Sequence, residues 1–355
     1  MSVPPAPPVT PQTPPPPPAV VRTALAPMQD LTTPAFMRLV AARGAPDFFV
    51  TEFVRVHATT RPEPELAEFL ARNDTGRPVV VQLIGEDIAA MTRAAREFAA
   101  LGAAGVDLNL GCPAPKVFRK NVGGGLLRDL PRVDALLAAL RDALPATPLS
   151  VKTRTGFDHR TDPSDLFDRL LEIVARRGVD LLAVHARDVR GLYRSPVDYS
   201  FVARAVRAVP CPVFANGEIS SAERAAGVVA ATGCAGVMCG RHAVRNPWLF
   251  RQIRERFAAG GGGAVFTPTL ADVRAYIGEL AEVAGGSVGA LKKFLNFVGT
   301  GVDAQGRFLA EMRRAPDLAQ LLAVCDAHLV AGGRGAEPFS PEPYAGVVSR
   351  PNCEA

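Results

Sequence analysis

The sequence predicts an α/β fold class, an eight-stranded (β/α) TIM barrel followed by a small all-helical C-terminal domain. Eight short runs rich in β-branched residues alternate with segments whose apolar residues recur three or four positions apart, the pattern of parallel strands joined by helices. Several runs, VVVQLI and LLAVHA among them, are almost continuously apolar, as expected for strands buried on both faces. The length of 355 residues suits one barrel of roughly 250 residues with an appended piece.

The chain begins with a proline-rich segment, residues 1–20, that we expect to be a disordered tail because proline cannot donate a backbone hydrogen bond. This segment lacks the features of a secretory signal, and no apolar run reaches the roughly 20 residues of a membrane span. We therefore expect a soluble, cytoplasmic monomer that contacts no membrane. The cysteines have no paired CxxC spacing, so neither a disulfide framework nor a bound metal is indicated; they are Cys112, Cys211, Cys234, Cys239, Cys325 and Cys353.

The barrel is expected over residues 21–260. Its eight strands are predicted at Val21–Met28, Phe48–Val54, Val79–Gly85, Val106–Gly111, Leu149–Arg154, Leu181–Ala186, Pro212–Asn216 and Gly236–Gly240. Segments such as IAAMTRAAREFAALG and PRVDALLAALRDAL lie between them and would form the outer ring of helices. The number of strands alone leaves an open, doubly wound sheet as an alternative.

After a glycine-rich joint, AAGGGGA, the alternation stops. Helical periodicity in LADVRAYIGELAEVAG and LKKFLNFVGTGV predicts a small helical domain over residues 264–332. Prolines and glycines without periodicity then predict a flexible tail over residues 333–355.

Polar residues stand where the expected strands end, which is the face on which such barrels carry their active sites. One such residue in an apolar strand is more often a satisfied core residue. Together they predict a polar cavity, since unpaired buried Lys or His side chains would cost several kcal/mol. The residues are Gln82, Asn109, Cys112, Lys152, Arg154, His185 and Asn216.

The loops after the last two strands, ANGEI and CGRHAVRNPW, place Gly217, Gly240 and Arg241 where barrels of this kind commonly hold a phosphate. Glycines let backbone N–H groups approach an anion, and an arginine can bind it bidentately. The alternative is an ordinary pair of turns.

The segment NLGCPAPKVFRKNVGGGLLRD places Cys112 at a strand end, between glycine and proline. An unperturbed thiol is mostly protonated near pH 7 and could act as an acid. A nearby base would instead favour nucleophilic chemistry, and a turn cysteine without a role is the third possibility.

These stretches, in this order and spacing, resemble the tRNA-dihydrouridine synthases, flavin-dependent barrels with a C-terminal helical RNA-binding domain. The resemblance runs from about Thr23 to Ile253 and rests on LAPMQDLT, FVTEFVRV, VVVQLIG, GVDLNLGCPAPKV, NVGGGLLRD, LSVKTRTGFD, LLAVHARD, VFANGEI and GVMCGRHAVRNPW. TEFVRV, the triple glycine and NGEI look most like the bacterial synthase C subgroup, which implies the D-loop and position 16. The chain departs from the family after His185, where Asp188 replaces a threonine.

The resemblance implies that NADPH reduces a bound FMN, which passes hydride to C6 of a uracil ring while Cys112 protonates C5. It implies a tRNA substrate and assigns the remaining roles residue by residue. The FMN contacts would be Ala26, Pro27, Met28, Gln82, Lys152, His185, Asn216, Gly217, Glu218, Gly240 and Arg241. The substrate contacts would be Asn109, Arg154 and Arg187.

A uridine inside folded RNA must be flipped out to reach the barrel, and basic side chains would offset that cost. A net charge of +5 and a pI near 9.0 fit a polyanionic partner but do not require one. The candidates are Lys116, Arg119 and Lys120, with Lys292 and Lys293 in the helical domain. Two other functions stay open: an FMN-dependent oxidoreductase of a free pyrimidine, like dihydroorotate dehydrogenase, and a non-catalytic RNA-binding barrel.

Overall fold

The computed structural model describes residues 20–258 and 264–349. Its strands are β1 (Arg22–Leu25), β2 (Phe48–Val50), β3 (Val54–Arg55), β4 (Val79–Ile84), β5 (Gly105–Leu110), β6 (Leu149–Arg154), β7 (Leu181–His185), β8 (Val213–Asn216) and β9 (Gly236–Cys239). All pair in parallel, and the pairing of β1 with both β2 and β9, together with that of β2 with β4, closes the ring. The predicted closed barrel is thereby confirmed, and the open-sheet alternative is excluded.

The second predicted strand, Phe48–Val54, is interrupted and forms both β2 and β3, each paired with β4. The interruption lies at Thr51, whose side-chain hydroxyl accepts the backbone N–H of Gln82 at 3.1 Å. A side-chain oxygen thus takes the place of a backbone carbonyl in the ladder, which the apolar pattern of the sequence could not reveal.

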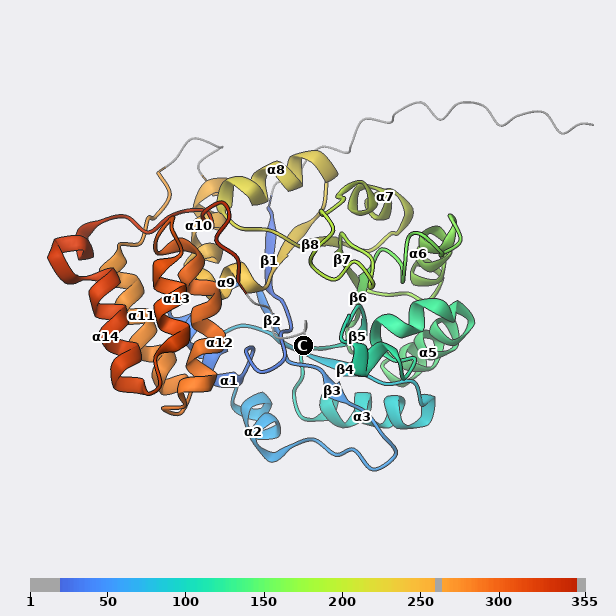
Figure 1. The fold of residues 1–355 in the computed structure, drawn as a ribbon. Coiled ribbons are helices and arrows are strands. Elements are labelled where there is room, and N and C mark those ends of the chain that lie inside the picture. The colour runs from blue at the N-terminus through green and yellow to red at the C-terminus, as the bar shows by residue number, and fades with distance from the viewer. Residues whose placement is uncertain (1–19, 259–263, 350–355) are drawn as a thin grey trace, which may run out of the picture.

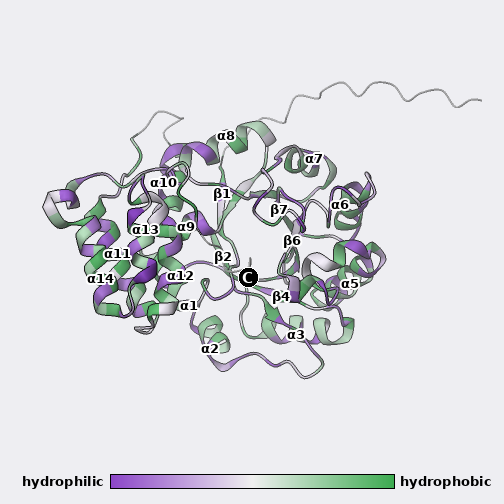
Figure 2. Ribbon diagram, viewed as in Figure 1, coloured by the Kyte–Doolittle hydropathy of each residue, from purple (hydrophilic) through white to green (hydrophobic). Residues whose placement is uncertain are grey.

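Helices surround the barrel in Figure 1. The outer ring consists of α1 (Pro34–Ala41), α2 (Pro64–Arg72), α3 (Ile88–Ala100), α5 (Leu130–Ala143), α6 (Leu166–Arg176), α7 (Ser200–Ala208), α8 (Ala222–Thr232) and α10 (Leu249–Ala258). Shorter elements lie in two loops: α4 (Pro115–Phe118), the 3-10 turn η1 (Gly123–Arg128) and α9 (Arg241–Arg245). The outer helices carry both hydrophobic and hydrophilic residues (Figure 2), because only one side of each contacts the strands.

The C-terminal helices form a bundle beside the barrel, drawn in orange and red in Figure 1. They are α11 (Leu270–Val283), α12 (Val288–Val298), α13 (Arg307–Arg314) and α14 (Leu318–Leu329), with the 3-10 turns η2 (Gly299–Gly301) and η3 (Ala331–Ala336). The bundle contacts the barrel where the ring centroids of Phe36 and Phe294 lie 5.3 Å apart. The hydroxyl of Tyr276 on α11 also donates to the carbonyl of Val244 on α9. The two parts therefore share a buried interface.

Part of the segment predicted to be a flexible tail packs against the rest of the chain. Phe339 is buried, its N–H donates to the carbonyl of Pro268, and Thr269 pairs with Pro338. Phe339 is an isolated aromatic residue in an irregular stretch, and its burial depends on contacts that sequence periodicity does not predict. The predictions for residues 1–19, for most of the glycine-rich joint and for residues 350–355 lie outside the described residues.

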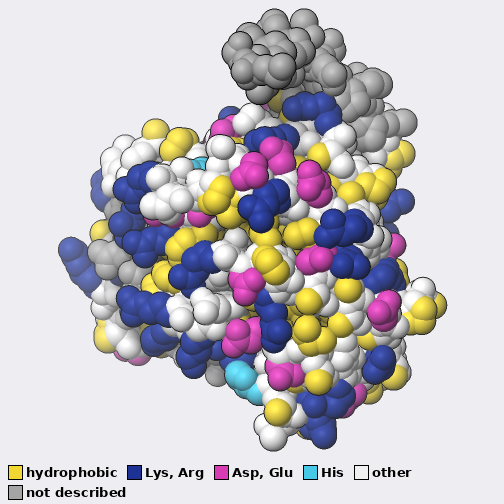
Figure 3. Space-filling view, turned by 90° about the vertical axis from the view of Figure 1, so that its right-hand side faces the viewer, with side chains coloured by type: hydrophobic (Ala, Val, Ile, Leu, Met, Phe, Trp, Pro, Cys, Tyr) yellow, Lys and Arg dark blue, Asp and Glu magenta, His cyan; other side chains and the backbone are white. Residues whose placement is uncertain are grey.

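None of the helices in the described ranges is both long and apolar enough to cross a bilayer. The face on the right of Figure 1, which carries α5 and α6, shows basic and acidic side chains interspersed in Figure 3. Several are paired there, as Arg176 and Arg177 are with Asp134. Among the described residues, charges of both signs are therefore mixed on this side.

Candidate active site

The ends of the strands surround a cavity of about 300 Å³. Four neighbouring strands and the loops after them contribute the predicted residues Gln82, Asn109, Cys112, Lys152 and His185. The structure therefore brings together residues that are spread over more than 100 positions of the sequence. The rest of the lining includes Pro27, Met28, Phe53, Arg154, Tyr193, Arg241 and Phe297.

The turn that carries Cys112 rests on the triple glycine of η1. The N–H of Gly124 donates to the carbonyl of Cys112, and a Cβ on Gly124 would lie 2.8 Å from that oxygen. Gly123 has a φ of +58°, and a Cβ there would lie 3.1 Å from the Cβ of Cys112. Any larger residue would displace the turn. Cys112 itself remains partly exposed at the cavity.

A chain of hydrogen bonds runs under the same turn. The N–H groups of Gly111 and Cys112 donate to Asn109 Oδ1 at 3.0 and 2.9 Å. Asn109 Nδ2 donates to Gln82 Oε1 at 2.7 Å, and Gln82 Nε2 donates to Asp107 Oδ2 at 2.7 Å. The two predicted amides are therefore linked to each other and to a buried carboxylate.

Lys152 extends into the cavity beside Cys112. Within the described residues its ammonium group makes no hydrogen bond or ion pair. Burial, followed by the positive charge of Arg154, lowers its pKa from 10.5 to about 8, although Asp107 and Cys112 oppose this. The amine is therefore mostly protonated at pH 7, and its charge faces open space rather than a protein partner.

His185 lies on the strand next to Lys152. Burial lowers its pKa well below 6.5, and the cations Arg154, Lys152 and Arg187 add to the effect. The ring is therefore neutral at physiological pH, with one nitrogen that donates a hydrogen bond and one that accepts.

A smaller cavity of about 80 Å³ adjoins the first and shares Pro27, Met28, Lys152, His185 and Arg241 with it. Its other predicted lining residues come from the end of β8 and from the loops after β1, β8 and β9: Asn216, Ala26, Gly217, Glu218 and Gly240. Gly217 has a φ of +110°, and a Cβ there would lie 3.0 Å from the ring of His185. A Cβ on Gly240 would lie 3.3 Å from the sulfur of Met28. The two glycines keep this end of the site open to a ligand.

Arg154 and Arg187, two of the predicted substrate contacts, also have protein partners. Arg154 is 1% exposed, and its guanidinium donates to the carbonyls of Gly111, Asp188 and Leu192. Arg187, 3% exposed, donates to the carbonyl of Ser195 and forms an ion pair with Glu218. Arg154 thus connects the turn after β5 to the loop after β7, and Arg187 connects that loop to the loop after β8.

Glu218, predicted to contact the cofactor, reaches the smaller cavity but is the ion-pair partner of Arg187. Asp188, at the departure from the family pattern, accepts the N–H groups of His159 and Gly191. It therefore organises the loop that follows His185.

The basic side chains predicted to contact RNA fall into two groups. Lys116, Arg119 and Lys120 are exposed on and just after α4, outside the residues that line the two cavities. Lys292 instead donates to the carbonyls of Arg313 and Ala315 at the end of α13, and Lys293 pairs with Asp30. These two lysines stabilise the bundle and its contact with the barrel.

Sequence reasoning missed three residues at the site. Tyr193 lines both cavities, with the guanidinium of Arg241 4.0 Å from its ring centroid. Phe297 reaches the larger cavity from α12, and no sequence pattern predicts that contact. Asp107 had a signal, because it stands two positions before Asn109 in an apolar strand and therefore faces the same side.

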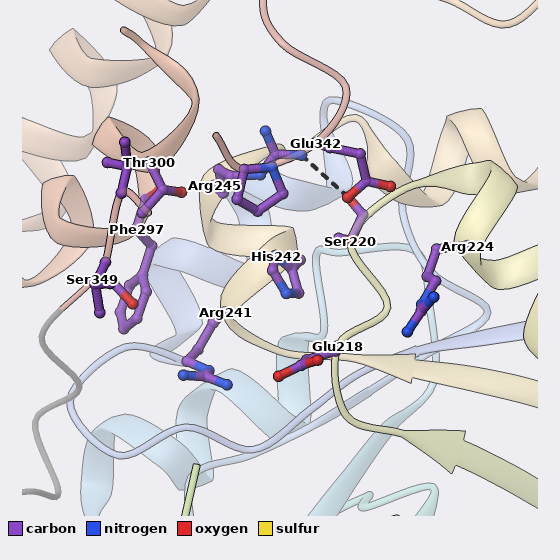
Figure 4. A pocket seen from close by; sticks show the side chains of 13 residues that line it. Glu218, Ser220, Arg224, Arg241, His242, Arg245, Phe297, Thr300, Glu342 and Ser349 are labelled. Atoms are coloured by element: carbon purple, nitrogen blue, oxygen red, sulfur yellow. Dashed lines mark hydrogen bonds between the residues drawn. The ribbon is translucent and has the colours of Figure 1, made fainter. Parts of the chain in front are cut away.

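A third cavity, of about 430 Å³, lies between the barrel loops, η2 and the C-terminal segment. Figure 4 shows Arg241, His242 and Glu218 on its floor, with Arg224 to one side and Phe297 opposite. Arg245 closes one end: it donates to the carbonyls of Ser220, Ser340 and Pro341. The C-terminal segment is thereby tied to the loops that carry Gly217 and Gly240.

A sequence profile of the family described as "Dihydrouridine synthase (Dus)" matches residues 24–274, which include every strand end at the site. The tRNA-dihydrouridine synthase B of Pseudomonas syringae pv. tomato is 36% identical over 236 residues, 66% of this chain and 68% of that protein. The tRNA-dihydrouridine(16) synthase of Neisseria meningitidis serogroup A is 35% identical over 270 residues, 74% and 79% of the two chains.

The similarity extends into the helical region in other relatives. The tRNA-dihydrouridine(16) synthase of Ralstonia nicotianae is 32% identical over 327 residues, 89% of this chain and 99% of that protein. Among solved structures, the old yellow enzyme homologue from Zymomonas mobilis (NCR) superposes with a TM-score of 0.49 and 14% identity, over 69% of this chain and 90% of that one. That likeness is too distant to bear on function.

Proposed function

The chain belongs to the dihydrouridine synthase family, and from this premise we propose that it reduces uridines of transfer RNA to dihydrouridine. The single observation that supports the reaction best is the cavity in which Cys112, Lys152 and His185 meet. Family membership supports the tRNA substrate, since the relatives are named tRNA-dihydrouridine synthases. One of them aligns with this chain over 99% of its own length.

The residues at the site fit a flavin mononucleotide. The larger cavity is lined by the ammonium of Lys152, the neutral imidazole of His185 and the side chain of Met28. These groups suit a planar ring that carries negative charge when reduced. The smaller cavity offers two open glycines and Arg241, a guanidinium that makes no hydrogen bond within the described residues, which suits a phosphate. We assign the ring to Lys152 and His185, and the phosphate to the loops of Gly217 and Gly240.

The reaction adds a hydride to C6 and a proton to C5 of the uracil ring. A flavin held by Lys152 and His185 would supply hydride chemistry at this site, with NADPH as the source of both electrons. Cys112 supplies the proton, because its thiol lies at the cavity and a thiol is mostly protonated near pH 7. Lys152 remains protonated and stabilises negative charge on the bound ring.

The RNA reaches the site as a flipped-out nucleotide. We assign its backbone contacts to Lys116, Arg119 and Lys120, since these exposed cations stand on the loop that follows Cys112. Phe297 and Phe53 line the larger cavity and offer apolar surface to a base. We propose position 16 as the uridine reduced, which is supported by relatives named (16) synthases that align with 74% and 89% of this chain. We also propose that the protein is a cytoplasmic monomer.

An oxidoreductase of a free pyrimidine is the main competing function. It would need no helical bundle, yet here α12 places Phe297 in the cavity and α11 donates to the barrel through Tyr276. Deletion of the bundle would expose this interface, so the intact protein is the proper test. A non-catalytic RNA-binding barrel is disfavoured by the thiol of Cys112 and by the amine of Lys152, which has no hydrogen-bond partner in the part of the chain that the structure describes.

The test is direct. The purified chain is expected to be yellow, to release FMN on denaturation, and to form dihydrouridine in unmodified tRNA when NADPH is supplied. Free uridine and uracil, offered to the same preparation, are expected to be poor substrates. A colourless protein that FMN does not reconstitute, or turnover of free pyrimidine with no product in tRNA, would contradict the proposal.

A further inference from the structure

Asp107 is a buried carboxylate beneath the floor of the cavity, with no part in the reaction described above. It is 2% exposed, and both of its oxygens accept hydrogen bonds: Oδ1 from Ser150 Oγ at 2.6 Å and Oδ2 from Gln82 Nε2 at 2.7 Å. These residues lie side by side on β4, β5 and β6 in the register of the sheet. The carboxylate therefore joins three strands inside the barrel.

The hydrogen-bond chain above Asp107 can run in one direction only. Backbone N–H groups only donate, so the two from Gly111 and Cys112 require the oxygen of Asn109 to face them. The nitrogen of Asn109 then faces Gln82 and requires the oxygen of that amide. Gln82 is left with its nitrogen toward position 107, where only an acceptor will satisfy it.

An ionised carboxylate is a pure acceptor, so it fixes the same orientation from the other end. Burial raises the pKa of Asp107 to about 6, while the hydrogen bonds from Ser150 and Gln82 and the charge of Lys152 oppose the rise. The group is thus mainly ionised at pH 7. If the Gln82 amide were flipped, its oxygen would face the carboxylate of Asp107 and its nitrogen would face the nitrogen of Asn109. Neither pair could form a hydrogen bond, and leaving buried polar groups without one is costly.

We propose that Asp107 is a positioning residue for Cys112, which it holds in place through the amides of Gln82 and Asn109. The chain ends on the backbone N–H of Cys112, so the orientation of two amides sets the turn from which the thiol faces the cavity. The inference rests on the proposed function only for the use of that thiol as an acid. The placement of the turn is independent of the substrate.

Two substitutions separate amide orientation from charge. Asp107→Asn removes the charge but can present its oxygen to Gln82 and its nitrogen to Ser150, whose hydroxyl can accept. Asp107→Leu has similar volume but offers no acceptor. As a matched control, Asp47→Leu removes a carboxylate that accepts the N–H and hydroxyl of Thr23 at the opposite end of the barrel.

The experiment uses the full-length flavin-loaded chain and measures the rate at which iodoacetamide alkylates Cys112, followed by peptide mapping so that other cysteines do not contribute. In Asp107→Leu we expect alkylation to be faster by about tenfold, the scale of one lost buried hydrogen bond. Asp107→Asn and Asp47→Leu are expected to stay within about threefold of the parent. Single-turnover reduction of tRNA should fall by about 10² in Asp107→Leu with unchanged affinity for tRNA, since a reacting group is misplaced.

An alkylation rate in Asp107→Leu equal to that of the parent would overturn the inference, as would an Asp107→Asn variant that behaves like Asp107→Leu. If Asp107→Leu does not fold, Gln82→Met cuts the chain one step nearer to Cys112, and a parental alkylation rate there would overturn it equally. A parent chain that makes no dihydrouridine would refute the proposed function, while the alkylation rates would still test the role of Asp107.

Discussion

Replacement of Lys152 by methionine is expected to stabilise the flavin-free chain while impairing its function. The pKa of Lys152 is lowered from 10.5 to about 8, chiefly by burial. A tenfold change in acidity corresponds to about 1.4 kcal/mol, so the protonated amine costs the folded chain about 3 kcal/mol. Methionine has a similar shape without the charge, and part of the gain is lost to imperfect packing. We expect the free energy of unfolding at pH 7 to rise by about 1–3 kcal/mol.

The pH dependence has a definite sign. Below pH 8 the amine is protonated in both the folded and the unfolded parent, so the folded parent bears the full cost. From pH 8 to 10.5 the folded chain has released this proton and the unfolded chain still holds it, so the parent gains stability relative to the variant. The advantage of the variant should therefore shrink over this window and vanish above it.

Urea denaturation of flavin-free parent and Lys152→Met at pH 7 and at pH 10 measures both effects. The exposed residue Lys120 provides the control, because Lys120→Met should leave the free energy of unfolding unchanged at either pH. A Lys152→Met variant less stable than the parent at pH 7, or a difference that stays constant between the two pH values, would refute the reasoning.

Three further predictions concern other parts of the chain. Cys112→Ala should retain flavin while dihydrouridine formation falls by roughly 10² to 10⁴, the usual effect of losing an acid catalyst; an unchanged single-turnover yield would remove Cys112 from that role. Arg241→Ala should lose FMN on dilution, measured by flavin absorbance, while Arg224→Ala, across the cavity of Figure 4, should retain it; equal occupancy in both would contradict the phosphate assignment. Phe339→Ala should lower the free energy of unfolding by about 3–5 kcal/mol, against almost nothing for the exposed Val348→Ala; a loss below about 1 kcal/mol would show that the C-terminal segment contributes little packing.

The barrel could be predicted from the sequence because its strands are nearly continuous apolar runs with helical segments between them. One strand, Leu149–Arg154, was predicted with the bounds that the structure has. Phe48–Val54 is divided into β2 and β3, and the other strands differ by a few residues at their ends. The gathering of Gln82, Asn109, Cys112, Lys152 and His185 followed from the same pattern, since parallel strands bring their carboxyl ends to one face.

The contacts that could not be predicted have a common physical cause. Arg154 and Arg187 were assigned to the substrate from the family resemblance, and segments distant in the sequence supply carbonyls to Arg154 and the carboxylate of Glu218 to Arg187. Phe339 lies in an irregular stretch, and its burial depends on distant segments such as α9, whose Arg245 guanidinium lies 5.3 Å from its ring centroid. Contacts between distant segments produce no periodic pattern in the sequence. The spacing of Asp107 and Asn109, two positions apart in one strand, does predict that their side chains face the same side.

Mapping dihydrouridine across the RNA of cells with and without the gene would show whether this chain makes dihydrouridine in tRNA. We expect the modification to be lost at position 16 of the D-loop in the deletion strain, and to be restored by the parent gene but not by Cys112→Ala. An unchanged dihydrouridine map in the deletion strain, or restoration by Cys112→Ala at the parental level, would contradict this expectation.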